Sequence, residues 1–270
     1  METTSANKSI GLSYSRANEH CGKRIYYNDV VKMPRTYNYY SASGTLMEEM
    51  VASQLRPMID GSPTVPMKQA GLKAIDEMIS MLPKDDLQQV MDELDASVAG
   101  AERYLETVDY TPLVLQQKGV LRFASMARET KLVIDLLMNR DGEDVIVDFK
   151  RKPKKLSDYK ISQQDWKYQL ALYAVWFMRT RLQREIPRCE IHVLLPGSAP
   201  QIVPINVNAE DIFITVNRLQ DLSWRLDHSY FPLNRNHPLC SQKWCQYYVR
   251  CHHDYFTGPD AILDAISDVR

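Results

Sequence analysis

The stretch KLVIDLLMNRDGEDVIVDFKRK, residues 131–152, decides the fold of this chain. Two apolar runs flank the dipeptide Asp141-Gly142, which is typical of a two-residue hairpin, because both central positions of a type I′ turn need positive φ. The stretch therefore predicts a β-hairpin. In the register that this turn sets, Asp135 lies directly opposite Asp148, and opposed residues share one face of a sheet.

The two opposed carboxylates are the first candidates for chemistry. Lys150 lies two residues beyond Asp148 and therefore points to the same face. Because Asp135 and Asp148 lie in strands otherwise rich in Val, Ile and Leu, we expect them to repel each other and to lose hydration. A divalent cation with oxygen ligands, such as Mg²⁺, is the natural counter-charge. Alternatively, both aspartates face solvent on a half-exposed hairpin, which the alternation of the strands also fits.

A helix is predicted after the hairpin, and it carries DWKYQLALYAVWF at residues 165–177. Gln169 and Tyr173 are four residues apart, so they share one face of this helix. A Gln amide and a Tyr hydroxyl can hold a phosphate or orient a water beside a metal. The alternative is that Tyr173 belongs to an apolar stripe that only packs in the core.

Together these residues resemble the motif of the PD-(D/E)XK nucleases, and specifically of their RecB-like branch. The matching positions are Asp135 on one strand, Asp148-Phe149-Lys150 on the next, and Gln169 with Tyr173 on the following helix. The resemblance implies an α/β fold with a restriction-endonuclease-like core, in which helices flank a mixed central sheet. It also implies a metal-dependent deoxyribonuclease, most simply an exonuclease, that hydrolyses phosphodiester bonds.

The segment Gly44-Thr45-Leu46-Met47-Glu48 is similar to a further motif of that family, in which a His follows a Gly by four residues. Glu48 stands at the His position, and a carboxylate can also ligate Mg²⁺ or Mn²⁺. Leu132 stands where the family often has a Gly, which is a second departure.

The resemblance assigns a role to each motif residue. It implies that Glu48, Asp135 and Asp148 bind Mg²⁺ or Mn²⁺, with the Phe149 carbonyl as a further ligand. It also implies that Lys150 orients the attacking water or stabilises developing charge, and that Gln169 and Tyr173 position the phosphate backbone.

Cysteines form a second pattern. Cys240, Cys245 and Cys251 are spaced C-x4-C-x5-C, whereas Cys21 lies near the start of the chain. The set is similar to that of iron–sulfur members of the RecB-like branch, such as AddB and certain CRISPR-associated nucleases. The resemblance implies a [4Fe–4S] cluster that staples the N- and C-terminal segments together. Four thiolates also suit tetrahedral zinc, for which the nearby histidines 237, 252 and 253 are substitute ligands. Unrelated thiols are the third alternative.

Length and composition limit the classes of protein in which these motifs can occur. The chain has 270 residues, with 44% hydrophobic and 25% charged residues, as is ordinary for a globular protein. A net charge of −1 argues against coating of nucleic acid by bulk charge, and leaves room for a local basic rim at residues 150–155. We expect a cytoplasmic protein because the sequence shows neither a secretory signal nor an apolar run long enough for a membrane span.

The predicted organisation is one nuclease domain over residues 13–256, between a flexible tail at 1–12 and a C-terminal tail at 257–270. Inside it we expect an N-terminal segment with Cys21 (13–65), a helical insertion (66–110), the nuclease core (111–230) and the cysteine cluster (231–256). The expected partners are DNA, including single-stranded ends, and proteins of a recombination or CRISPR-adaptation system, with no membrane. Two other classes stay open: a catalytically inactive nucleic-acid-binding protein, and a zinc-stapled interaction protein.

Overall fold

The core of the molecule is a five-stranded mixed sheet. The computed structural model describes residues 10–19, 21–34, 36–109, 111–237, 239–241 and 245–256. Its strands are β1 (Thr111–Leu121), β2 (Thr130–Arg140), β3 (Glu143–Arg151), β4 (Arg188–Leu195) and β5 (Ser198–Ile205), paired in that order. β3 and β4 are parallel and the other neighbours are antiparallel, so the predicted mixed sheet is confirmed.

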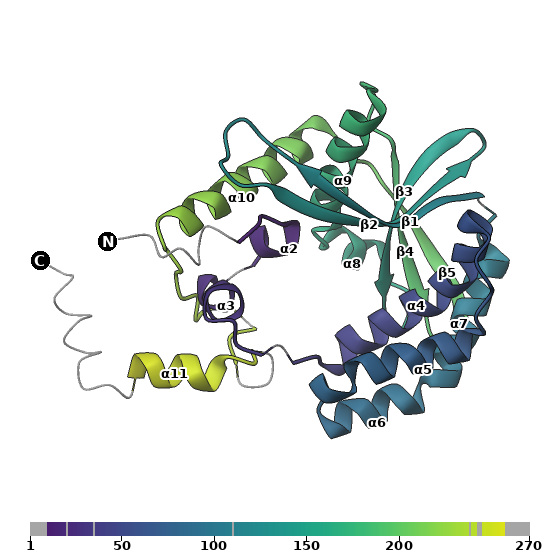
Figure 1. Cartoon of the computed structure of the whole chain (residues 1–270), viewed down its shortest axis with the longest axis horizontal. Coiled ribbons are helices and arrows are strands. Elements are labelled where there is room, and N and C mark those ends of the chain that lie inside the picture. The colour runs from purple at the N-terminus through teal and green to yellow at the C-terminus, as the bar shows by residue number, and fades with distance from the viewer. Residues whose placement is uncertain are drawn as a thin grey trace, which may run out of the picture.

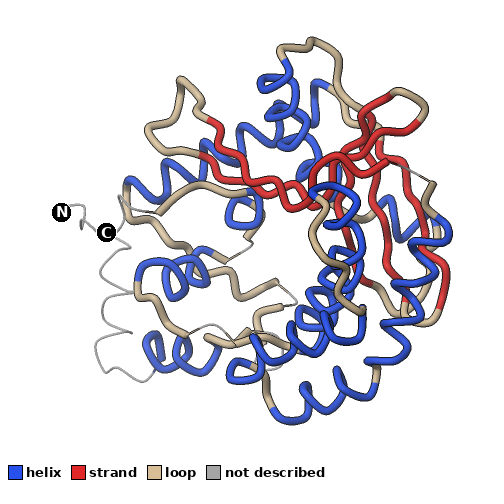
Figure 2. The backbone as a smooth tube through the Cα atoms, turned by 45° about the vertical axis from the view of Figure 1, so that its right-hand side comes forward, coloured by secondary structure: helices blue, strands red, loops and turns tan. Residues whose placement is uncertain are grey.

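Helices cover both faces of this sheet (Figure 1; Figure 2). They are α2 (Tyr14–Ala17), α3 (Gly22–Ile25), the π-helix η1 (Tyr26–Val30), α4 (Tyr39–Asp60), α5 (Met67–Met78), the 3-10 helix η2 (Ile79–Met81), α6 (Lys84–Asp92), α7 (Leu94–Thr107), α8 (Asp158–Ser162), α9 (Trp166–Arg181), α10 (Ala209–Asp227) and α11 (Tyr248–Phe256). None of these described helices combines the length and the apolar character that crossing a bilayer requires.

Two hydrophobic cores lie on opposite faces of the sheet. One contains Leu170 and Phe177 of α9 with Leu219 of α10, and the other contains Leu46 and Met50 of α4 with residues of α5 and α7. Because successive strand residues point to opposite faces, Ile146 enters the first core and Val145 and Val147 enter the second. β3 is therefore buried on both faces, which explains its continuous apolar run.

Capping residues fix the ends of the two helices that flank the sheet. Asn38 and Ser41 form a capping box at the start of α4, and Gly61 ends that helix in the left-handed conformation, with φ 72°. Asn208 and Asp211 form the equivalent box at the start of α10. These local hydrogen bonds satisfy the N–H groups that have no partner inside a helix, so both helices have defined ends.

The N-terminal region departs from the sequence prediction. With Ser13 or Ser15 as an N-cap, the sequence predicts a continuous helix over residues 13–27, but the chain breaks between α2 and α3, and η1 follows directly. Residues 1–9 of the expected tail lie outside the described residues, and the tail does not extend to residue 12. Ile10 is buried, and Leu12 is fully buried and exchanges backbone hydrogen bonds with the start of β2. The C-terminal tail at 257–270 also lies outside the described residues.

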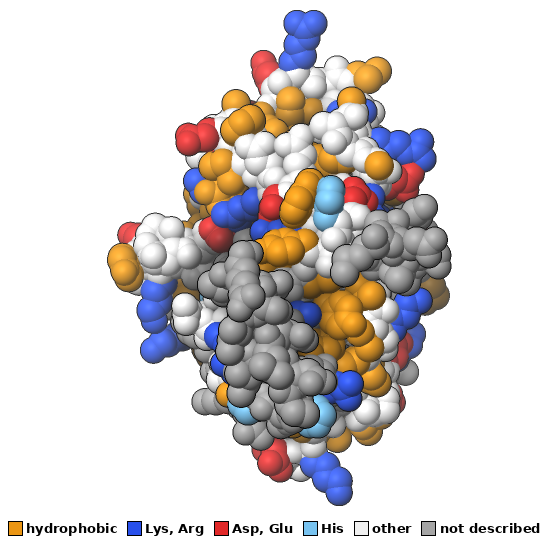
Figure 3. Space-filling view, turned by 90° about the vertical axis from the view of Figure 1, so that its left-hand side faces the viewer, with side chains coloured by type: hydrophobic (Ala, Val, Ile, Leu, Met, Phe, Trp, Pro, Cys, Tyr) orange, Lys and Arg blue, Asp and Glu red, His pale blue; other side chains and the backbone are white. Residues whose placement is uncertain are grey.

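Segments from the two ends of the sequence come together on one side of the molecule. α3 and α11 are drawn at the same side of the ribbon, in purple and yellow (Figure 1). An added Cβ on Gly22 would lie 2.6 Å from Pro232, so the first turn of α3 is pressed against the segment that follows α10. On this face, hydrophobic side chains gather near the centre and Lys and Arg side chains lie around them (Figure 3).

Candidate active site

The predicted hairpin has the predicted turn and register. Asp141 and Gly142 have φ of 53° and 86°, so both central turn residues adopt the positive values that type I′ requires. The β2–β3 pairing runs from Arg140–Glu143 to Leu136–Val147, and one further step puts Asp135 opposite Asp148. At that step the Asp135 Oδ2 atom accepts the Phe149 N–H at 2.8 Å. The end of the backbone ladder thus holds the Asp135 carboxylate in place.

Asp148 is a buried carboxylate that is compensated at one oxygen only. The residue is 1% exposed, and its Oδ1 atom has no hydrogen-bond partner among the described residues. Its charge is met by an ion pair with the Lys150 ammonium, whose side chain is 27% exposed. The ion pair with Lys150 is made by Oδ2, so the buried Oδ1 atom is left without compensation and suits a cation with oxygen ligands.

Lys150 continues into a short polar chain on α9. Its Nζ atom donates to Gln169 Oε1 at 3.3 Å, and Gln169 Nε2 donates to the Tyr173 hydroxyl at 2.6 Å. Tyr173 is also buried in the first core, as the packing interpretation expects, and its functional role stays a prediction. The hairpin and α9 together form a chain of contacts that runs from the Asp148 carboxylate through Lys150 and Gln169 to the Tyr173 hydroxyl.

Glu48 reaches the same place from α4. Burial raises the pKa of its carboxyl to about 8, and the charge of Asp135 adds to this effect, while Lys150 opposes it. Its neighbour Glu49 lies elsewhere, where it accepts a hydrogen bond from Gln116 at 2.9 Å and pairs with Arg56 at 3.0 Å. The two adjacent glutamates of α4 therefore have different surroundings, and Glu48 is the one coupled to the hairpin.

The charges of this cluster shift one another. Burial raises the pKa of Asp135 to about 7, with the Asp148 charge as the next cause. Burial lowers the pKa of Lys150, but the charges of Asp148, Asp135 and Glu48 outweigh this effect and leave the pKa raised. Three ionised carboxyl groups around one ammonium would leave an excess of negative charge, and the raised pKa values of Glu48 and Asp135 reduce that excess in the metal-free protein. Such strongly perturbed groups beside a cleft are typical of functional sites.

A cleft of about 700 Å³ opens beside these residues. Asp135, Gln169 and Tyr173 lie in its wall, and Arg24 and Lys131 add cationic side chains. A cation bound by the carboxylates would therefore lie close to a space that a ligand can enter. As it stands, no set of three or more His, Cys, Asp or Glu side chains in the described part of the chain forms a metal-binding cluster.

The four cysteines of the sequence pattern surround a second, smaller cavity. Cys21, Cys240, Cys245 and Cys251 all line it, and none of them forms a disulfide. Burial raises the pKa of the Cys245 and Cys251 thiols, and the charges of the other cysteines add to this. The fold thus brings Cys21 to the C-terminal cysteines. As described, the four thiols do not form a group that could hold a metal ion. The fifth, Cys189, is buried in the sheet, as a core thiol would be.

The basic rim is only partly as expected. Arg151 is not a rim residue, because its side chain is 3% exposed and contacts Tyr39 and Glu93 inside the molecule. Sequence reasoning missed this ion pair, and it also missed the pair between Arg24 and Glu19 beside the cleft. Both pairs depend on tertiary contacts, and no local spacing signals them.

The profile of the PD-(D/E)XK nuclease superfamily matches residues 12–252, which is most of the chain. The chain belongs to the PD-(D/E)XK nuclease superfamily. Among curated proteins, none is similar enough in sequence to count as a match.

A solved structure shares the fold of this PD-(D/E)XK protein. A protein from Eubacterium rectale described as "Putative exonuclease" superposes with a TM-score of 0.57 at 14% identity, over 98% of each chain. The protein SSO0001 gives a TM-score of 0.39 at 15% identity, over 85% of this chain and 93% of that chain, a likeness too low to support an argument. The first match supports a common fold over the whole chain.

Proposed function

We propose that this PD-(D/E)XK protein is a metal-dependent deoxyribonuclease that acts as an exonuclease. The observation that carries the proposal is the buried Asp148 carboxylate opposite Asp135, which pairs with Lys150 through Oδ2 and has no partner at Oδ1. Membership of the superfamily and the likeness to a protein described as an exonuclease support it.

In this proposal Glu48, Asp135 and Asp148 hold Mg²⁺ or Mn²⁺, with the Phe149 carbonyl as a further ligand. The donor set fits, because it consists of hard oxygen ligands whose negative charges a divalent cation would offset. A divalent cation held there would polarise the scissile phosphate and lower the pKa of the attacking water. DNA enters through the cleft that Asp135 and Tyr173 line.

The chain's own groups have separate roles. Lys150 keeps its proton, because the carboxylates raise its pKa, and its ammonium can stabilise negative charge that develops on the phosphate. Gln169 holds Lys150 through its Oε1 atom and Tyr173 through its Nε2 atom. We therefore assign Gln169 to positioning and Tyr173 to the phosphate backbone of the substrate.

Cleavage of end-labelled DNA tests the proposal. The wild-type protein should degrade single- or double-stranded DNA from an end with Mg²⁺ or Mn²⁺ and stop when EDTA is added. Asp148→Asn and Lys150→Met should each abolish cleavage, whereas Asp141→Asn in the exposed turn of the same hairpin should leave it intact. Full activity of purified Asp148→Asn would overturn the assignment. Binding without cleavage by the wild-type protein would favour an inactive DNA-binding protein.

We also propose that Cys21, Cys240, Cys245 and Cys251 hold a [4Fe–4S] cluster. Their convergence on one cavity supports this, and the nearby cations Lys23 and Arg24 lower the pKa of Cys251 and Cys245, respectively, although burial outweighs them. Thiolate ligation couples metal binding to folding. Protein purified without air should therefore be brown, and Cys21→Ala should be colourless and less stable, whereas Cys189→Ala should keep the colour. A colourless protein with one equivalent of zinc would establish the zinc alternative. Partner proteins of recombination or CRISPR adaptation stay a prediction.

A further inference from the structure

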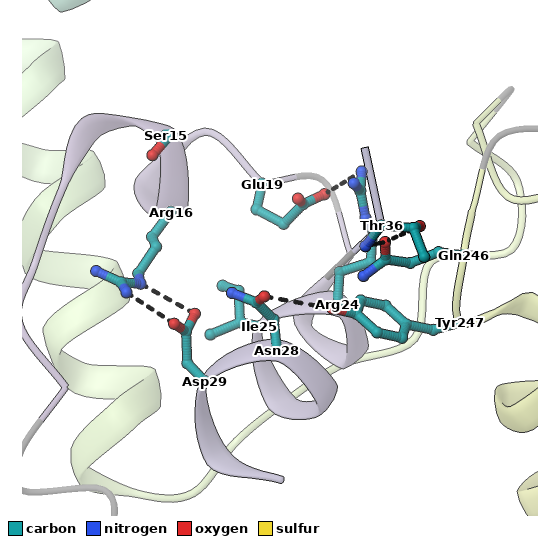
Figure 4. A pocket seen from close by; sticks show the side chains of 10 residues that line it. All are labelled: Ser15, Arg16, Glu19, Arg24, Ile25, Asn28, Asp29, Thr36, Gln246 and Tyr247. Atoms are coloured by element: carbon teal, nitrogen blue, oxygen red, sulfur yellow. Dashed lines mark hydrogen bonds and ion pairs between the residues drawn. The ribbon is translucent and has the colours of Figure 1, made fainter. Parts of the chain in front are cut away.

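Arg24 lies where three cavities of the molecule meet. It lines the cleft that Asp135 and Tyr173 also line, and it lines the cavity of the four cysteines. It also lines a pocket of about 250 Å³ between η1 and the segment that carries Gln246 and Tyr247 (Figure 4). No assigned role in the reaction uses this residue.

The guanidinium of Arg24 is only partly satisfied. Its Nη1 atom donates to Glu19 Oε1 at 3.2 Å, and its Nε atom is buried with no hydrogen-bond partner. Arg16 in the same pocket is different, because Nε and Nη2 donate to the two oxygens of Asp29 at 2.9 and 2.7 Å (Figure 4). A guanidinium is built for such two-point contact with a carboxylate or a phosphate. Arg16 has this contact, whereas the Arg24–Glu19 pair rests on one long hydrogen bond.

Glu19 lies at an unfavourable place for a nucleic-acid cleft. It lines both the cleft and the pocket of Figure 4, and its side chain is 20% exposed. A polyanionic strand that enters beside Asp135 would meet a further negative charge here, unless Glu19 moves away. A phosphodiester at the position of Glu19 would remove that repulsion and could accept the hydrogen bond that Arg24 Nη1 now donates to Glu19.

We propose that Arg24 is a phosphate-binding residue for a DNA strand in the cleft, and that Glu19 occupies the phosphate position in the free protein. This inference rests on the proposed action on DNA. A cleft of about 700 Å³ suits a few groups of one strand, since volumes of roughly 300–1,000 Å³ hold a single small ligand. We therefore assign the site to single-stranded DNA.

The position of Arg24 depends on the cysteine region. Its N–H donates to the Cys21 carbonyl at 3.0 Å, so it belongs to the single turn that Cys21 begins. That turn is pressed against Pro232. Each Arg24 variant is therefore checked for an intact fold and for its bound metal before its affinity for DNA is compared with that of the wild-type protein.

Equilibrium binding of a fluorescent single-stranded oligonucleotide tests the proposal. The full chain is used in EDTA, so that cleavage is blocked, and affinity is measured by anisotropy at several salt concentrations. Arg24→Gln should weaken binding about tenfold, and should reduce the slope of log K against log salt by about 0.7, the value for one phosphate contact on a single strand. Arg24→Lys should keep most of that slope, because it keeps the charge.

Glu19→Gln is the decisive second variant, because it removes a charge without removing the cation. It should tighten binding at least threefold, and this gain should vanish when Arg24→Gln is also present. The pair Arg103 and Glu106 is the matched control, since its Nη1–Oε2 distance is also 3.2 Å and both side chains are exposed. Arg103→Gln and Glu106→Gln should change neither the affinity nor the slope beyond the small effect of a distant charge.

The outcomes separate this inference from the proposed nuclease. Weaker or unchanged binding by Glu19→Gln would overturn the inference, and so would an unchanged salt slope in a folded Arg24→Gln protein, while DNA cleavage by the wild-type protein would still stand. A wild-type protein that neither binds nor cleaves DNA would overturn both. If Arg24→Gln does not fold, as shown by circular dichroism, the sign of the Glu19→Gln effect decides alone.

Discussion

Asp135→Asn should stabilise the metal-free protein in alkaline solution. Burial and the charge of Asp148 raise the pKa of Asp135 from 3.8 to about 7 in the folded protein. The folded state therefore binds a proton that the unfolded state has already released, so stability falls as pH rises from about 4 to 7. A cation with oxygen ligands would reverse this loss by meeting the charge.

The size of the effect follows from the shift. About three pKa units at about 1.4 kcal/mol each correspond to about 4 kcal/mol of lost stability above pH 7. Between pH 5 and pH 8 the part that is lost is about 3 kcal/mol, because the group titrates over roughly two units in that range. An Asn at position 135 has no charge, and its amide oxygen can still accept the Phe149 N–H that Asp135 Oδ2 accepts at 2.8 Å.

Thermal unfolding in EDTA measures the difference. A change of 1 kcal/mol shifts the unfolding midpoint by about 2–4 °C for a protein of about this size. The midpoint of Asp135→Asn relative to that of the wild-type protein should therefore rise by about 6–12 °C when the pH is raised from 5 to 8. Added Mg²⁺ should raise the midpoint of the wild-type protein more at pH 8 than at pH 5, and that of the variant little at either pH.

Asp141→Asn is the matched control, because this carboxylate of the same hairpin has a side chain that is 90% exposed. It should follow the wild-type protein at every pH. A midpoint difference between Asp135→Asn and the wild-type protein that is the same at pH 5 and pH 8 would refute the reasoning, because the burial cost of the charge would then be absent.

Three further predictions concern other parts of the chain. Glu48→Gln should weaken Mn²⁺ binding measured by calorimetry and should lower cleavage, whereas Glu49→Gln, on the outer side of the same helix, should do little; equal effects would contradict the assignment. Gly100→Ala should lower the free energy of unfolding by about 1–3 kcal/mol in urea, because its Cβ would lie 2.3 Å from the Leu195 carbonyl oxygen. Burial lowers the pKa of His192, so stability should fall as pH drops below about 6.5, and His192→Gln should flatten that part of a pH–stability curve; an unchanged slope would show that the group does not contribute.

The sequence predicts those parts of the site that depend on short-range geometry. The turn at Asp141 and Gly142 follows from a local φ requirement, and it fixes the register that puts Asp135 opposite Asp148. The face shared by Gln169 and Tyr173 follows from helical spacing alone, and the hydrogen bond between them is present. Each of these predictions needs only residues that are close in sequence.

Contacts between residues far apart in the chain could not be predicted from the sequence. The pair between Arg151 and Glu93 joins residues 58 positions apart, and the charged run at 150–155 gives no sign that one of its members is buried. The break between α2 and α3 was also missed, because an N-cap signal at Ser13 or Ser15 does not say where the chain must turn to pack Gly22 on Pro232. Tertiary packing decided these cases.

The helical segment of residues 66–110 matches no motif, and the structure gives it a physical role. α4 carries Glu48 and packs with α5 and α7 in the core beneath the sheet. Arg151, the residue after Lys150, donates to the Tyr39 hydroxyl at the start of α4 and pairs with Glu93 at the start of α7. The Arg151 side chain is buried, so its contacts with Tyr39 and Glu93 tie β3 to α4 and to α7 inside the molecule. The distance between Glu48 on α4 and Asp148 on β3 therefore depends on the helical segment, which makes that segment part of the construction of the site.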